Sequence, residues 1–170
     1  MNVLLVILRA VHILTGVFWA GAVFTVVRFV SPAIGDAGPE GAKVMGALVK
    51  RGFLNVVPGA AVLTILSGLW MFWIDSSGFS GPWMSSHMGM TLALGAVFAL
   101  VGLGFGVFGM RASVLKAMAL GQSLAQLPEA AREGTMAQIQ ALRARAAAAG
   151  KIVAGLLGAA VALMAIARYV

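Results

Sequence analysis

The sequence predicts an all-α, polytopic membrane protein, a four-helix bundle in which helices 3 and 4 extend into a cytoplasmic hairpin. The 170-residue chain is 61% hydrophobic and only 10% charged, a composition whose surface could not face water on all sides. It also contains four long apolar stretches that approach or exceed the length of about 20 residues needed to cross a bilayer. We therefore expect a single membrane domain over residues 1–170.

The membrane-spanning segments are expected at residues 3–30, 53–74, 84–110 and 152–169. Residues 31–40 contain two prolines and should form a loop outside the hydrocarbon. Pro58 lies near the start of the second span, where its missing N–H should matter least. Within the third span, glycines repeat every seven residues and predict close packing against another helix; they are Gly95, Gly102 and Gly109.

Residues 111–150 are expected to form the helical hairpin in the cytoplasm. The third helix should continue beyond the membrane until Pro128 breaks it. Thr135 with Gln138 fits a capping box, which predicts that the last helix begins there. From Thr135 to Tyr169 this helix would be roughly 50 Å long, against about 30 Å of hydrocarbon. The last two helices should therefore protrude from the membrane.

Basic residues predict the topology. They gather around the first and third inter-helix loops, whereas residues 75–85 contain none. By the positive-inside rule both basic loops face the cytoplasm, and both termini lie outside, in a bacterial-type inner (plasma) membrane. The net charge of +7 then reports topology and contact with anionic lipid, so we expect no nucleic-acid partner.

The first span contains one of only two histidines in the chain. His12, Gly16 and Trp19 are spaced i, i+4 and i+7, so they share one face of a helix, and Arg9 lies one turn earlier on the same side. A flat ligand held by the imidazole could lie over Gly16 against Trp19, with Arg9 meeting an acidic edge. An ionisable side chain within a membrane span is by default a candidate functional residue.

The second histidine, His87, is expected one turn into the third helix. Both that turn and His12 fall in the outer leaflet, so the two imidazoles could share one ligand. Two imidazoles from different helices suit the axial positions of a b-type haem, with Arg9 pairing a propionate and Gly16 admitting the porphyrin edge. The absence of cysteine excludes disulfides, thiolate zinc sites, iron–sulfur clusters and covalently attached haem.

Two other functions stay open. Met84, His87 and Met88 at i, i+3 and i+4 would share a face, and thioether with imidazole is a Cu(I) ligand set, although methionine is also a common packing residue. The chain could instead be a non-catalytic subunit or assembly factor of a larger complex. If the chain binds haem, we expect electron transfer or another membrane oxidoreductase reaction. The expected partners are the lipid bilayer and a quinone or a redox protein. Whether the chain forms a homo-oligomer is left open.

The segment from His12 to Gly21, written H-x6-W-x-G, resembles the first-helix signature of membrane proteins related to the copper-resistance protein CopD and to HemJ-type protoporphyrinogen oxidases. Arg28 also falls where the HemJ-type pattern has an arginine. The resemblance implies haem b or copper in a four-helix bundle, with His12 as ligand. HemJ-type proteins carry a lysine early in the third helix, and residues 83–90 have none, which argues against protoporphyrinogen oxidation.

Overall fold

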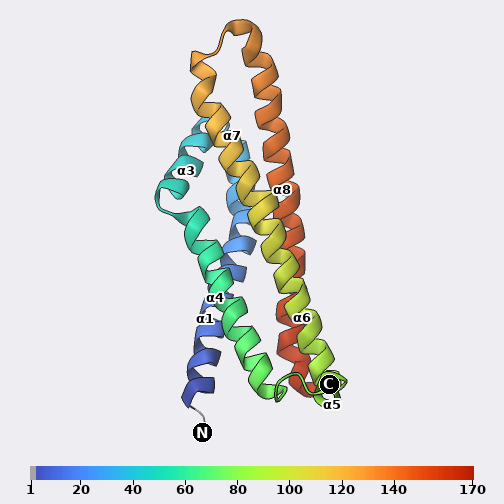
Figure 1. Ribbon diagram of the computed structural model, residues 1–170. Coiled ribbons are helices and arrows are strands. Elements are labelled where there is room, and N and C mark those ends of the chain that lie inside the picture. The colour runs from blue at the N-terminus through green and yellow to red at the C-terminus, as the bar shows by residue number, and fades with distance from the viewer. Residues whose placement is uncertain (1–2) are drawn as a thin grey trace.

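The computed structural model describes residues 3–170, which form helices and short turns without any strand (Figure 1). Within that range, four helices are long and apolar enough to cross a membrane: Val3–Asp36, Phe53–Asp75, His87–Gln126 and Glu129–Tyr169. The all-helical fold and the four apolar helices of membrane-spanning length, both predicted from the sequence, are confirmed.

Two of the long helices are composite. The first consists of α1 (Val3–Thr25), a π-helical segment (Val26–Val30) and α2 (Ser31–Asp36); α3 (Pro39–Lys50) then leads to α4 (Phe53–Asp75). After the short α5 (Gly81–Met84), the third long helix consists of α6 (His87–Gly104), a second π-helical segment (Phe105–Arg111), α7 (Ala112–Ser123) and a 3-10 turn (Leu124–Gln126). The last helix is α8 (Glu129–Ile166), which ends in the 3-10 turn Ala167–Tyr169.

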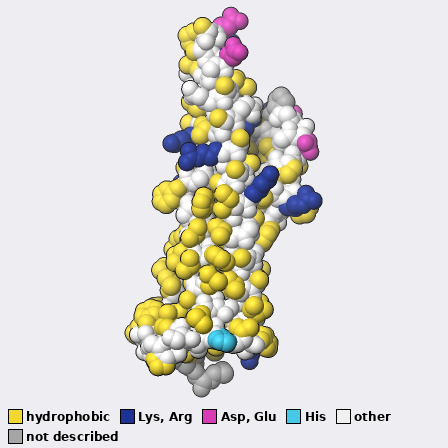
Figure 2. Space-filling view, turned by 90° about the vertical axis from the view of Figure 1, so that its right-hand side faces the viewer, with side chains coloured by type: hydrophobic (Ala, Val, Ile, Leu, Met, Phe, Trp, Pro, Cys, Tyr) yellow, Lys and Arg dark blue, Asp and Glu magenta, His cyan; other side chains and the backbone are white. Residues whose placement is uncertain are grey.

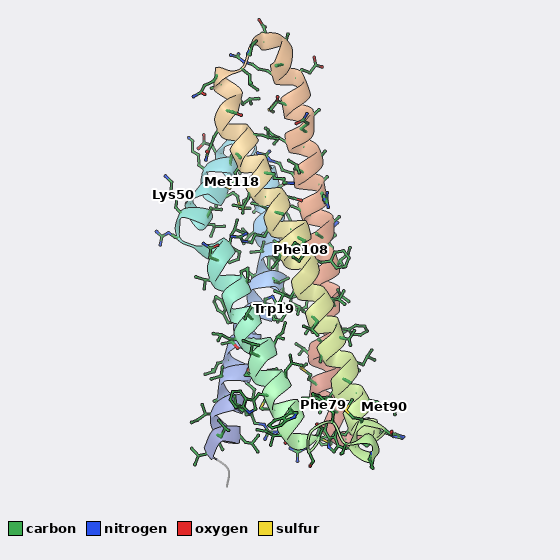
Figure 3. All side chains as sticks on the ribbon, viewed as in Figure 1. Trp19, Lys50, Phe79, Met90, Phe108 and Met118 are labelled. Atoms are coloured by element: carbon green, nitrogen blue, oxygen red, sulfur yellow. The ribbon has the colours of Figure 1, made fainter. Side chains whose placement is uncertain are left out.

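The helices associate as two pairs. α1 packs mainly on α4, while α6 and α7 pack on α8, and α8 also contacts α1 (Figure 1). The start of α1, the end of α8 and α5 all lie at one end of the bundle. Trp19 lies at the middle of the bundle (Figure 3), among the buried side chains that join the pairs. These include Val23, Val57, Ala61, Ala99, Val153 and Leu157.

The glycine repeat of the third helix faces α8. A Cβ placed on Gly95 would lie 3.3 Å from Met164 Cγ, and one on Gly102 would lie 3.7 Å from Leu157 Cδ2. On Gly109 it would lie only 2.9 Å from the Cβ of Ala149. The predicted close packing is therefore confirmed, because the missing side chains let the backbones of the two helices approach.

Gly109→Ala should lower the stability of the protein in detergent by about 1–3 kcal/mol, because the added methyl group overpacks the contact with Ala149. Gly106→Ala is the matched control, since it lies in the same π-helical segment and its Cβ would meet nothing within 4 Å. Any gain in helix propensity is common to the two variants. Equal unfolding midpoints for both would show that Gly109 does not hold the helices together.

Pro58 is compensated by a cation from the third helix. Proline has no N–H, so in α4 it cannot donate to the carbonyl four residues earlier, that of Leu54. Arg111 takes over this role: its Nε donates to the Leu54 carbonyl oxygen at 2.9 Å, and its Nη2 donates to Asn55 Oδ1 at 2.8 Å. Pro58 lies beyond the first turn of α4, so its missing donor leaves the Leu54 carbonyl to be satisfied by another group.

The loop expected at residues 31–40 is shorter than predicted. The helix continues through Pro32 to Asp36, and the turn into α3 is confined to residues 37–38, where Gly38 has a φ of 56°. Proline inside a helix clashes with the preceding turn, and the π-helical segment Val26–Val30 lies directly before α2. Its wider turn accommodates the proline, so the helix continues instead of ending.

The start of the last helix also differs from the prediction. α8 begins at Glu129, directly after Pro128, whose φ of −55° and ψ of 148° suit the residue that precedes a helix. Thr135 lies inside the helix, and its Oγ1 donates to the carbonyl of Ala131 at 2.9 Å instead of capping a terminus. Gly134 does not interrupt α8, because a single glycine costs a helix only about 1 kcal/mol.

Candidate functional site

His12 of α1 is held by the backbone of α4. Its Nδ1 lies 2.7 Å from the carbonyl oxygen of Thr64. A carbonyl can only accept, so Nδ1 carries a proton and donates it. In the neutral imidazole the unprotonated nitrogen is then Nε2. Among the described residues Nε2 has no hydrogen-bond partner, and it is not buried.

Gly68 provides the space for this imidazole. A Cβ at Gly68 would lie 2.6 Å from Cε1 and 2.8 Å from Nδ1 of His12, closer than real Cβ contacts allow. Gly68 lies four residues after Thr64, one turn further along the same face of α4. The carbonyl that orients His12 and the gap that admits it therefore belong to one short stretch of α4.

Hydroxyl groups surround the contact between α1 and α4. Thr15 Oγ1 lies 2.8 Å from Thr64 Oγ1, and each hydroxyl also lies 2.7–2.8 Å from the carbonyl four residues earlier in its own helix. Ser67 Oγ donates to the carbonyls of Leu63 and Thr64. Polar groups of this kind hold membrane helices together, because hydrocarbon offers them no other partner.

These α4 residues were not predicted as part of the site. Thr64, Ser67 and Gly68 are the small and polar residues at the centre of an otherwise apolar second span. Such small and polar residues in an apolar span are the signal that could have identified partners for a histidine on a neighbouring helix. The sequence alone does not say which two helices are neighbours, so it could not predict that these residues contact His12.

His12, Gly16 and Trp19 lie in one continuous helix, α1, and both His12 and Gly16 face α4. Thr64 fills the space over Gly16, where a Cβ would lie 3.3 Å from Thr64 Cγ2. Trp19 is only 4% exposed and borders an apolar cavity of about 50 Å³, which is too small for a porphyrin. The expected position of a flat ligand over Gly16 against Trp19 is therefore occupied by protein.

His87 does not join the group around His12 in this structure. It was expected one turn into the third helix, but it is the first residue of α6, directly after Ser86, whose Oγ accepts a hydrogen bond from Gly89 N at 3.0 Å. His87 and Arg9 are both exposed. Since α1 contacts α4 and α8 rather than lying along α6, the fold provides no direct route between the two imidazoles.

The three residues of the expected copper site, Met84, His87 and Met88, do not lie on one helix. Met84 is the last residue of α5, whereas His87 begins α6, and the extended backbone of Ser86 lies between them. Met84, His87 and Met88 therefore do not share one helical face, because the predicted continuous helix is interrupted. Within residues 3–170 there is also no group of three or more His, Asp or Glu side chains that could hold a metal ion.

Comparisons of the chain with protein-family models, with curated proteins and with solved structures found no match. The resemblance to CopD-related and HemJ-type proteins accordingly rests on the sequence motifs alone.

Proposed function

We propose that this chain is a multi-pass membrane protein that binds one b-type haem through Nε2 of His12 and passes electrons to or from a membrane quinone or a partner redox protein. The supporting observation is the 2.7 Å contact between His12 Nδ1 and the Thr64 carbonyl. Metal-ligating histidines typically donate their second ring N–H to a carbonyl or carboxylate, which fixes the ring and raises its basicity as a ligand.

The accessibility of Nε2 supports the same proposal. The nitrogen that would bind iron is neither buried nor paired with another described group, whereas every buried side-chain nitrogen or oxygen in residues 3–170 has a partner. His12 would hold the haem through this nitrogen, and the Thr64 carbonyl would keep the ring oriented. A bound haem would supply one-electron chemistry at its iron. His87, the second ligand expected from the sequence, could join His12 only if α6 came against α1, and in this structure α1 packs on α4 and α8 instead.

The proposed location is a bacterial-type inner membrane, with both chain ends outside and the hairpin of α7 and α8 in the cytoplasm. Figure 2 supports this orientation: most of the visible Lys and Arg side chains form a band between a largely apolar body and a tip that carries acidic residues, and a histidine lies near the opposite end. Such a band is typical of the cytoplasmic boundary of a membrane protein.

The proposal predicts a b-type haem spectrum for the protein purified in mild detergent, with a Soret band that shifts when dithionite is added. His12→Ala should lose most of the haem while keeping its helix content and elution volume, because it removes the iron ligand but no buried core side chain. Haem content is measured by the pyridine haemochrome assay. A colourless wild-type protein, even after haem is supplied during expression, would contradict the proposal.

His87→Ala gives the matched comparison, since it is the same chemical change at the other histidine. A change from a six-coordinate to a five-coordinate spectrum in this variant would place His87 opposite His12. An unchanged spectrum would assign haem ligation to His12 without His87. Full haem content in both alanine variants would show that neither histidine is a ligand.

A further inference from the structure

A groove lies between the third and fourth long helices, away from His12. It is an open surface groove with a volume of about 570 Å³. All but one of the lining residues are small or apolar: Val101, Gly104, Phe105, Phe108, Gly109, Ala148, Ala149 and Ile152. Figure 3 shows Phe108 on the third long helix beside α8. The one ionisable residue that lines the groove is Arg145.

Arg145 has no counter-charge in the described part of the chain. It is exposed and forms no ion pair or hydrogen bond there, and the single salt bridge found among residues 3–170 joins Lys43 to Glu40 on α3. It differs in this from Arg111, whose guanidinium is engaged by Leu54 and Asn55. The groove therefore combines an apolar lining with a cation that has no counter-charge.

The position of Arg145 along α8 matches the depth of a lipid headgroup. From Arg145 to the end of α8 at Ile166 the helix rises roughly 32 Å, about the thickness of the hydrocarbon core. With Tyr169 at the outer boundary, about 30 Å of hydrocarbon reaches back to residue 149, so Arg145 lies about one turn beyond the hydrocarbon, at the level of the headgroups. Ile152 is two turns deeper, so the apolar lining runs from the headgroup level into the hydrocarbon.

We propose that this groove binds one anionic phospholipid of the inner leaflet, with its phosphate paired to Arg145 and an acyl chain along the lining between Phe108 and Ile152. Basic pockets between membrane helices on the cytoplasmic side recognise anionic headgroups in this way. The guanidinium can bond two phosphate oxygens at once, which favours arginine at such a site. The proposal does not depend on haem binding, because His12 lies on a different pair of helices.

The test is native mass spectrometry of the full chain in detergent, titrated with dioleoyl phosphatidylglycerol or dioleoyl phosphatidylcholine. We expect one retained phosphatidylglycerol per chain, with roughly fivefold preference over phosphatidylcholine. Arg145→Gln should abolish the preference, whereas Arg143→Gln, an exposed arginine outside the groove lining, should keep it. Equal preference in wild type and Arg145→Gln would overturn the proposal.

Filling the groove tests the apolar part separately. A Cβ at Gly104 meets nothing within 4 Å, so Gly104→Leu should fold while its side chain occupies the groove and weakens retention of the lipid. Gly155→Leu is the control, because it adds the same side chain at an open position of α8 that does not line the groove. Unaltered lipid binding in Gly104→Leu would show that the groove is not a lipid site.

Discussion

Gly68→Ala is expected to lower the haem content of the purified protein by about tenfold or more, the effect typical of disturbing the group that orients a metal ligand. The new methyl group would lie 2.6–2.8 Å from the His12 imidazole, so the ring must turn away from the Thr64 carbonyl. The hydrogen bond that orients Nε2 is then lost. Haem content and the position of the Soret band measure the effect.

Gly59→Ala is the matched control, since it lies in α4 and its Cβ would meet nothing within 4 Å. Gly68→Ala should also destabilise the protein by about 1–3 kcal/mol through overpacking. This loss should disappear when His12→Ala removes the imidazole, which separates the proposed clash from general damage to α4. A Gly68→Ala protein with normal haem content and normal stability would contradict the arrangement.

Arg111→Ala is expected to lower stability by about 2–3 kcal/mol. It leaves the Leu54 carbonyl without a donor at a buried residue, and hydrogen bonds from charged groups are worth about 1.5–3 kcal/mol. The measurement is the free energy of unfolding in mixed micelles. Lys116→Ala serves as the control, because Lys116 is exposed and makes no hydrogen bond or ion pair with the described residues.

A double-mutant cycle with Pro58→Ala isolates the cause. Alanine at position 58 restores the N–H that the Leu54 carbonyl lacks, so Arg111→Ala should cost less in the Pro58→Ala background. Additive effects of the two substitutions would show that Arg111 stabilises the fold in some other way than by replacing the missing donor.

The sequence was sufficient for features that depend on the bilayer or on one helix face. Apolar length predicts the four long helices, because hydrocarbon admits only segments whose backbone is satisfied internally. The repeat of Gly102 and Gly109 predicts the packing face of the third helix. Trp19 was placed in the same helix as His12, but its role in the core depends on which helix lies opposite, and that is a property of the assembled bundle.

Local capping and proline effects explain why two helix starts differ from the prediction. Ser86 caps α6 through the N–H of Gly89, so the third helix begins later than its apolar run, and His87 lies at its terminus. At the start of the last helix, Pro128 directly precedes α8. Thr135, which was expected to cap this helix, lies within it. The partners of His12 were hidden for a different reason, since Thr64 is 52 residues away in the chain.

The π-helical segment Phe105–Arg111 also sets the rotational phase of the helix that follows it. A strict seven-residue repeat from Gly109 would bring Lys116 against α8, yet Lys116 is exposed and Ala117 is buried. The wide π-helical turn contains one extra residue, and each residue turns a helix by about 100°. The buried position therefore moves from residue 116 to residue 117. The apolar side of α7 thus stays on α8, and the lysine is directed away from it.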